Sequence, residues 1–252
     1  MKILTLNLRK HYGMSKILAK SLALAFIFIF IGKISSDTYV RSSAYVDVLS
    51  EITEKSTVII DAGHGGEDCG AIGVNGIYEK DLNLEISVEL GKILSENGYA
   101  VVYTRTNDAL LYTEEENIYG IRKISDLKNR CKYGAEYPNA IYISVHMNAY
   151  KSAKCSGLQV YYSTDNDSSY SLASSIQSSV KNRLQADNNR QVKEGKGMYL
   201  LENLSNPAVL IECGFLTNPE ECEKLAEKEY QKQLSFAIFC GIIDYKGIGV
   251  EN

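Results

Sequence analysis

Four residues of this 252-residue chain have side chains suited to metal-assisted hydrolysis: His64, Glu79, His146 and Glu212. Two neutral imidazoles and one carboxylate suit one Zn²⁺ ion, which takes nitrogen and oxygen ligands at about 2.0–2.2 Å. Three protein ligands leave a fourth position for water, whose pKa the metal lowers to about 7. A second carboxylate that is not a ligand is then needed to take the proton of that water and deliver it to a leaving group.

Short apolar runs predict the strands that position these residues. We expect strands at residues 57–61, 99–104, 140–145, 157–162 and 208–211. Helical spacing of apolar residues predicts helices at 79–97, 122–136, 168–185 and 219 to about 245. Strands that alternate with helices indicate the α/β class, as a three-layer sandwich with a mostly parallel central sheet and helices on both faces.

The four candidate residues fall next to the ends of these elements. His64 follows the first predicted strand within a Gly-rich turn, His146 directly follows the third, and Glu212 directly follows the strand at 208–211. Glu79 begins the first predicted helix. In open α/β sheets, ligands bind beyond the carboxyl ends of the strands. We therefore expect the four side chains to meet at one edge of the sheet.

Taken singly, each of these residues has an ordinary structural explanation. His64 fits a surface turn, and His146 fits a core position with satisfied hydrogen bonds. Glu79 suits a helix N-terminus because of the helix dipole, and Glu212 fits a buried ion pair. Their spacing is also not a compact motif such as H-E-x-x-H. The metal-site interpretation therefore depends on all four meeting at one edge.

The first 34 residues have the composition of a secretory signal peptide or signal anchor. Basic residues precede an apolar run at 21–32 (SLALAFIFIFIG), and Lys33 follows it. A buried core helix is the alternative. Residues 35–55 are polar and are expected to form a tether, and residues 56–247 the catalytic domain. We expect a protein outside the cytoplasm, secreted or attached to the membrane by its N-terminal segment.

The bulk composition is that of an ordinary globular protein, with 45% hydrophobic residues, 23% charged residues and a net charge of −4. No basic patch or RNP-type motif is present, so no nucleic-acid partner is expected. The six cysteines lack C-x-x-C spacing, and we expect buried free thiols.

Five stretches, taken in order, resemble the zinc N-acetylmuramoyl-L-alanine amidases. They are residues 61–66 (DAGHGG), 79–83 (EKDLN), 104–105 (TR), 144–148 (SVHMN) and 211–218 (IECGFLTN). The resemblance spans about residues 57–245. It implies that His64, Glu79 and His146 bind zinc and that Glu212 is the catalytic glutamate. It also implies a peptidoglycan substrate, cleaved at the amide between the lactyl group of N-acetylmuramic acid and L-alanine.

A narrower resemblance concerns residues 122–130 (RKISDLKNR), which look like the spore-cortex amidases of endospore formers. That subgroup acts during cortex synthesis on the route to muramic δ-lactam, which would place this chain in the cortex space around the forespore. Arg130 and Arg190 are candidate contacts to substrate carboxylates or sugars, with surface solvation as the alternative. Asn148 is a further candidate for positioning the substrate.

Two features typical of other family members are absent from the sequence. Cell-division amidases carry a long insertion with a blocking helix after the strand at 157–162, whereas here about one helix separates that strand from Arg190. We therefore expect an open groove. No cell-wall-binding repeats are present, so we expect the N-terminal segment or an accessory protein to localise or activate the enzyme.

Three alternatives remain open from sequence alone. Another zinc hydrolase of peptidoglycan, such as a carboxypeptidase or a sugar deacetylase, is disfavoured by the ordered motifs. A non-catalytic module that binds peptidoglycan or a partner is disfavoured because all four site residues are intact. A structural zinc site usually has four protein ligands, often cysteines, and that pattern is absent.

Overall fold

The computed structural model describes residues 57–118 and 121–247. The chain divides into Met1–Ile52 and Thr53–Asn252. The predicted leader and tether lie outside the described residues. Among the described helices, none combines the length and apolar character needed to cross a bilayer.

A six-stranded sheet forms the centre of the described domain, in the order β2-β1-β3-β6-β4-β5. The strands are β1 (Thr57–Ala62), β2 (Ala100–Tyr103), β3 (Ile141–Asn148), β4 (Gln159–Tyr162), β5 (Lys193–Glu194) and β6 (Ala208–Phe215). The pairs β2–β1, β1–β3 and β3–β6 are parallel, and β4 runs antiparallel to β6. The predicted mostly parallel sheet is confirmed.

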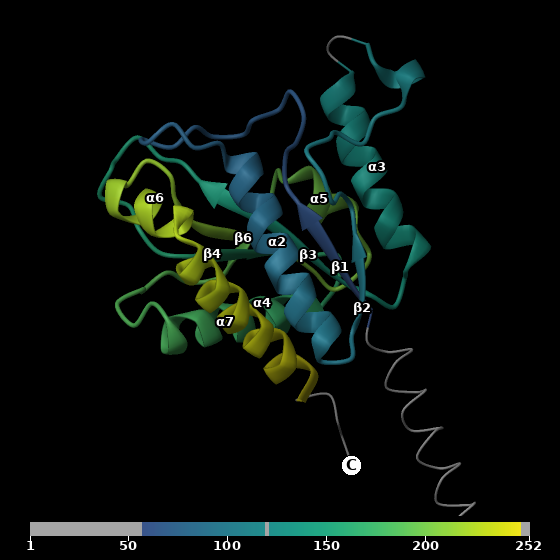
Figure 1. Cartoon of the computed structure of the whole chain (residues 1–252). Helices are drawn as coiled ribbons and strands as arrows, with labels where there is room; N and C mark the ends of the chain where they lie inside the picture. Colours follow the sequence, from purple (N-terminus) through teal and green to yellow (C-terminus); the bar gives the residue numbers. More distant parts are fainter. Residues whose placement is uncertain (1–56, 119–120, 248–252) are drawn as a thin grey trace, which may run out of the picture. The chain divides into compact units, whose positions relative to one another are not determined.

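Helices cover both faces of this sheet, as Figure 1 shows, and the predicted three-layer arrangement is confirmed. One face packs against α2 (Glu79–Glu96), α4 (Ser168–Arg183) and α7 (Lys228–Gly247), with α6 (Pro219–Ala226) beside them. The other face packs against α3 (Arg122–Glu136) and the short α5 (Tyr199–Asn203). A 3₁₀ turn, η1 (Glu114–Glu116), precedes α3.

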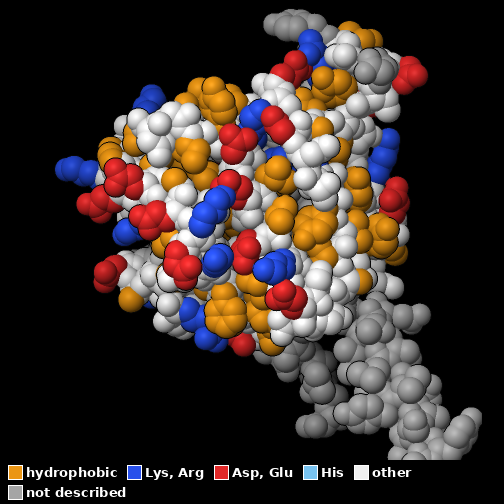
Figure 2. Space-filling view, in the orientation of Figure 1, with side chains coloured by type: hydrophobic (Ala, Val, Ile, Leu, Met, Phe, Trp, Pro, Cys, Tyr) orange, Lys and Arg blue, Asp and Glu red, His pale blue; other side chains and the backbone are white. Residues whose placement is uncertain are grey.

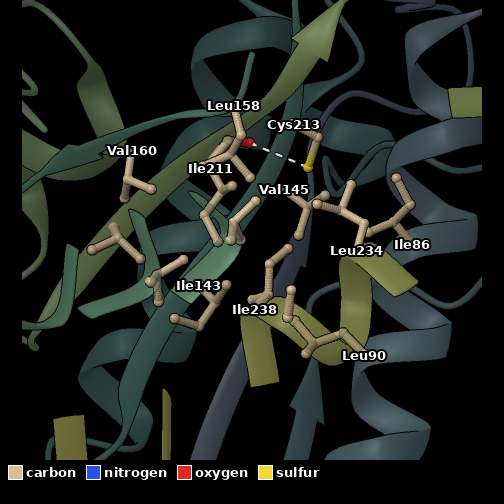
Figure 3. Close-up of a cluster of buried hydrophobic side chains, with 14 of the residues drawn as sticks. Ile86, Leu90, Ile143, Val145, Leu158, Val160, Ile211, Cys213, Leu234 and Ile238 are labelled. Atoms are coloured by element: carbon tan, nitrogen blue, oxygen red, sulfur yellow. Dashed lines mark hydrogen bonds between the residues drawn. The ribbon is translucent and has the colours of Figure 1, made fainter. Parts of the chain in front are cut away.

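The larger core lies between the sheet and α2, α4 and α7. In Figure 3, Val145 and Ile211 from the sheet meet Ile86 of α2 and Leu234 and Ile238 of α7. All five side chains are fully buried. Burying one such side chain contributes about 1.5–3 kcal/mol, so this layer fixes where α2, and with it Glu79, sits against the sheet.

The surface over α2 and α7 carries interspersed charges. In Figure 2, Lys and Arg side chains alternate with Asp and Glu across this face. Lys228 forms an ion pair with Glu85, for example, and Nζ of Lys232 lies 3.9 Å from Oε2 of Glu229. This mixed pattern means that the face in view has no extended field of one sign.

The structure corrects three expectations about the elements. The predicted final helix is two helices, because the chain turns out of helical geometry at Glu227 (φ −79°, ψ 123°). His146 and Glu212 lie inside β3 and β6 rather than after them, because the two strands continue to pair beyond the apolar runs. All six cysteines are free, but only Cys213 and Cys222 are buried.

A cavity in the larger core should destabilise the domain without reaching the site. Ile238→Ala removes a fully buried side chain of α7 and is expected to lower the free energy of unfolding by about 2–5 kcal/mol. Urea denaturation of the two proteins measures the difference. An unchanged midpoint would contradict the assignment of Ile238 to the core.

Candidate metal centre

The register of β3 and β6 places His146 beside Glu212. The two residues are directly paired across these parallel strands, and Gln159 of β4 pairs with Glu212 on its other side. Since paired residues share a face of the sheet, their side chains form a row across three strands. The shared register brings together one predicted metal ligand and the predicted general base, which are 66 positions apart in the sequence.

The Gly-rich turn after β1 places His64 opposite His146. His64 has φ 61°, and among the described residues it alone combines a side chain with a positive φ. A Cβ atom on Gly63 would lie 2.2 Å from the ring of His146, so only glycine allows the turn to approach this closely. The backbone N–H of Gly63 donates to the carbonyl of Val145 at 3.0 Å, which ties the turn to β3.

The three predicted metal ligands converge. The Oε1 atom of Glu79 lies 3.2 Å from Nε2 of His64 and 3.0 Å from Nδ1 of His146. One ligand atom from each residue lies within 4.8 Å of the others. Both imidazole side chains are only 17–18% exposed, and Glu79 is buried. The three residues therefore form one candidate binding site for a cation.

The carboxylate of Glu79 is fixed by hydrogen bonds to both oxygens. The N–H of Met147 donates to Oε1 at 3.1 Å, and the N–H of Ala71 donates to Oε2 at 2.8 Å. Burial would raise the pKa of Glu79, but the hydrogen bonds with His146 and His64 hold it well below its usual value. Glu79 is therefore ionised at neutral pH, as a metal ligand must be.

Asp68 orients the ring of His64, and sequence reasoning did not single it out. Its Oδ2 atom lies 2.9 Å from Nδ1 of His64, on the opposite side of the ring from Glu79. Burial alone would lower the pKa of His64, but Asp68 and Glu79 raise it to about 9. The hydrogen bond from His64 lowers the pKa of Asp68 to about 2. A carboxylate on Nδ1 leaves Nε2 for a metal, and such partners are common behind metal-binding histidines.

Glu212 lies in a different environment from Glu79. Its Oε2 atom is shielded from solvent and has no hydrogen-bond partner. Burial raises the pKa of Glu212 to about 7, while the nearby His146 lowers it and Glu79 raises it. A partly buried carboxyl that exchanges its proton near neutral pH, next to a candidate cation site, suits general acid–base chemistry.

The donor set fits zinc. Two imidazole nitrogens and one carboxylate oxygen are ligands that Zn²⁺ takes in sites with an open position. Glu212 is paired with His146 across the sheet but is not among the converging ligand atoms, which matches a carboxylate that is not a ligand.

The structure separates the three predicted substrate contacts. Arg130 is 1% exposed and is bonded to groups inside the protein, so its predicted contact with substrate is wrong. Asn148 ends β3 two residues beyond His146 and is partly exposed. Arg190 is also partly exposed. Its Nη1 atom donates to Gln159 at 3.1 Å, and its guanidinium lies 4.4 Å from the ring of Phe215. Asn148 and Arg190 remain candidates.

A three-layer α/β domain that gathers two histidines and two glutamates at the carboxyl edge of its sheet has the organisation of a metal-dependent hydrolase. Residues 58–244 match the family of N-acetylmuramoyl-L-alanine amidases. The chain belongs to this family, and the expectation of an amide hydrolase acting on peptidoglycan is confirmed.

Individual relatives agree with this assignment. The germination-specific N-acetylmuramoyl-L-alanine amidase of Bacillus subtilis is 37% identical over 188 residues, which cover 75% of this chain and 78% of that protein. The CwlD amidase from Clostridioides difficile, solved in complex with the GerS lipoprotein, is 38% identical with a TM-score of 0.74 over 77% of this chain and 99% of that one. The predicted resemblance to spore-cortex amidases is therefore confirmed.

A more distant solved structure shows the same fold. The amidase AmiC2 of Nostoc punctiforme is 31% identical, with a TM-score of 0.67 over 77% of this chain and 99% of that chain.

In this chain, the segment between β4 and Arg190 is mainly α4, whose Leu172 and Ile176 are buried in the larger core. The apolar face of α4 therefore packs into the core, and its other face is exposed.

Removing one candidate ligand should remove the metal. His146→Ala is expected to reduce bound zinc from about one ion per chain to almost none, because two protein ligands rarely retain zinc. Elemental analysis of the purified protein measures this ratio. His11→Ala changes the third histidine of the sequence and serves as the matched control, which should keep its zinc. Full zinc content in His146→Ala would refute the ligand assignment.

Proposed function

We propose that this chain is a zinc-dependent amidase that cleaves the bond between N-acetylmuramic acid and L-alanine during maturation of the spore cortex. One observation supports the proposed chemistry: Glu79 and the two histidines converge on one point, and Glu212, whose Oε2 atom has no hydrogen-bond partner, is paired with His146 across β3 and β6. The germination-specific relative and the CwlD structure support the biological setting.

When bound at these three residues, zinc supplies a Lewis acid that polarises the substrate carbonyl and makes water a better nucleophile at neutral pH. Glu212 accepts a proton from the attacking water and delivers it to the nitrogen of the leaving L-alanine. The carbon–nitrogen bond breaks, a carboxylate forms on the lactyl group, and the stem peptide leaves with a free amine. Asn148 and Arg190 are the candidate groups for holding the substrate.

The products of digestion test the reaction. Purified full chain is incubated with peptidoglycan, with added zinc or with a chelator, and the products are identified by mass. Free stem peptides that begin with L-alanine are expected with zinc and not with chelator. Shortened stem peptides would indicate a carboxypeptidase instead, deacetylated sugars a deacetylase, and no product at all a non-catalytic module.

Glu212→Gln should separate catalysis from metal binding. The substitution keeps the shape of the side chain but removes its ability to accept a proton, so turnover should fall by about 10²–10⁴-fold. Zinc content should remain that of the unchanged protein. Glu220→Gln, an exposed glutamate in α6, is the control and should keep full activity. Retained turnover in Glu212→Gln would overturn its assignment as general base.

The cortex setting predicts a product in the spore wall. If the enzyme acts on the route to muramic δ-lactam, cells that lack it should form a cortex without that lactam. Mass analysis of cortex muropeptides measures the lactam directly. A normal lactam content in such cells would rule out this role.

We further propose that the N-terminal segment attaches the enzyme to the membrane and that an accessory protein assists it. The apolar run at 21–32 supports the first point, and the CwlD complex with a lipoprotein supports the second. Removal of residues 1–34 should release the protein into the soluble fraction, and continued sedimentation with membranes would contradict the attachment.

The accessory protein is tested by comparing rates of wall cleavage. An accessory protein is unnecessary if the purified chain with zinc cleaves wall as fast as it does in cells.

A further inference from the structure

Two buried arginines lie behind the turn that carries His64. Arg105 is 4% exposed and Arg130 is 1% exposed. The carbonyl of Ala62 accepts from Nε of Arg105 at 2.8 Å and from Nη1 of Arg130 at 2.8 Å. Three successive carbonyl oxygens, those of residues 62, 63 and 64, therefore accept hydrogen bonds from these two guanidinium groups.

Arg130 holds the carbonyl of His64 itself. Its Nη2 atom donates to that oxygen at 2.7 Å, while Nη1 pairs with Asp61 at 2.6 Å and Nε pairs with Asp126 at 2.7 Å. His64 has a left-handed backbone, which costs a residue with a side chain about 1–3 kcal/mol and persists only where surrounding contacts fix it. The hydrogen bond from Arg130 is one of those contacts.

The same two arginines connect the turn to the other two ligands. Nη2 of Arg105 donates both to the carbonyl of Gly63 at 2.9 Å and to the carbonyl of Lys80 at 2.8 Å, next to Glu79 in the first turn of α2. Asp61, which pairs with Arg130, also accepts from the hydroxyl of Ser144 at 2.6 Å. Ser144 lies in β3 two residues before His146.

Stability alone does not account for this arrangement. Burying a charge is costly, and replacing a buried ion pair with apolar side chains of similar volume is often neutral or stabilising. Arg105, moreover, makes its hydrogen bonds to backbone carbonyls, those of residues 62, 63, 80 and 107. Three of these four carbonyls, those of residues 62, 63 and 80, belong to segments that carry or adjoin candidate metal ligands.

We propose that Arg105 and Arg130 are positioning residues, whose guanidinium groups hold the backbone of residues 62–64 so that His64 is preorganised for zinc. This inference rests on the proposed zinc ligands. It assigns the two arginines a role in metal affinity rather than in contact with substrate.

The test is a zinc titration of the full chain after the metal has been stripped, in competition with a chromophoric chelator. Arg130→Lys keeps the positive charge, but a single ammonium cannot reach Asp61, Asp126 and the two carbonyls together. Its Kd for zinc is expected to rise by about 10–100-fold, as for other partners behind metal ligands. Arg105→Lys is expected to behave in the same way.

Two controls separate positioning from general destabilisation. Arg183→Lys makes the same exchange in α4, and Ile238→Ala lowers stability through the larger core. Both should bind zinc as the unchanged chain does. Asp126→Asn is a milder variant in case Arg130→Lys does not fold. It removes the charge opposite Nε of Arg130, while the amide oxygen can still accept from the N–H of Leu111, and it should raise Kd by a smaller factor.

An unchanged zinc Kd in Arg130→Lys and Arg105→Lys overturns the proposal. So does an equal rise in Ile238→Ala, because any loss of stability would then explain the effect. If the unchanged chain binds no zinc, the proposed metal site fails, and the positioning role fails with it. Zinc binding by the unchanged chain together with unaffected arginine variants refutes the positioning role alone.

Discussion

The parallel register of β1, β3 and β6 is the constraint on which the rest of the site depends. In this register, Val145 pairs with Ala62 and His146 pairs with Glu212. A slip of one residue between β3 and β6 would turn one set of side chains to the opposite face. His146 and Glu212 would then point away from each other. The apolar residues of the displaced strand, Ile143 and Val145 of β3 or Ile211 of β6, would leave the larger core, so the packing that stabilises the sheet also fixes the site.

A second constraint is the buried charge beneath the candidate metal centre. Asp61 is fully buried at the end of β1 and accepts from Arg130, Ser144 and Thr104. Burial would raise the pKa of Asp61, but Arg130 and the two hydroxyl groups hold it below its usual value. Because those donors come from α3, from β3 and from the residue that follows β2, satisfying one carboxylate brings these three elements into place around β1.

Most helices and strands could be predicted because the apolar runs and helical spacing that indicate them lie within each element itself. The helix Arg122–Glu136 was predicted with the observed bounds. The three candidate ligands converge at the expected edge, where Glu212 pairs with His146. The extension of β3 beyond Val145 was not predictable, since it depends on pairing with a strand more than 60 residues away. The break at Glu227 lacks a proline or glycine that would mark it.

The misjudged role of Arg130 has the same origin. Arginine in a helix is usually exposed, and only the folded chain shows that Asp61, 69 positions earlier, lies against it. Asp68 was overlooked because a carboxylate in a Gly-rich turn ordinarily reads as a turn residue. In both cases the role of the residue depends on the side chain or backbone group that it contacts, and that contact is found only in the tertiary structure.

The contrast between the two glutamates supports the proposed division of roles. Both belong to one site, but both oxygens of Glu79 are bonded, whereas Oε2 of Glu212 has no partner. Hydrogen bonds keep Glu79 ionised and fixed, as a ligand requires. Burial leaves Glu212 with a pKa of about 7, as proton transfer near neutral pH requires. Two carboxyl groups with such different environments are suited to different tasks, and exchanging them would require rebuilding the contacts of both.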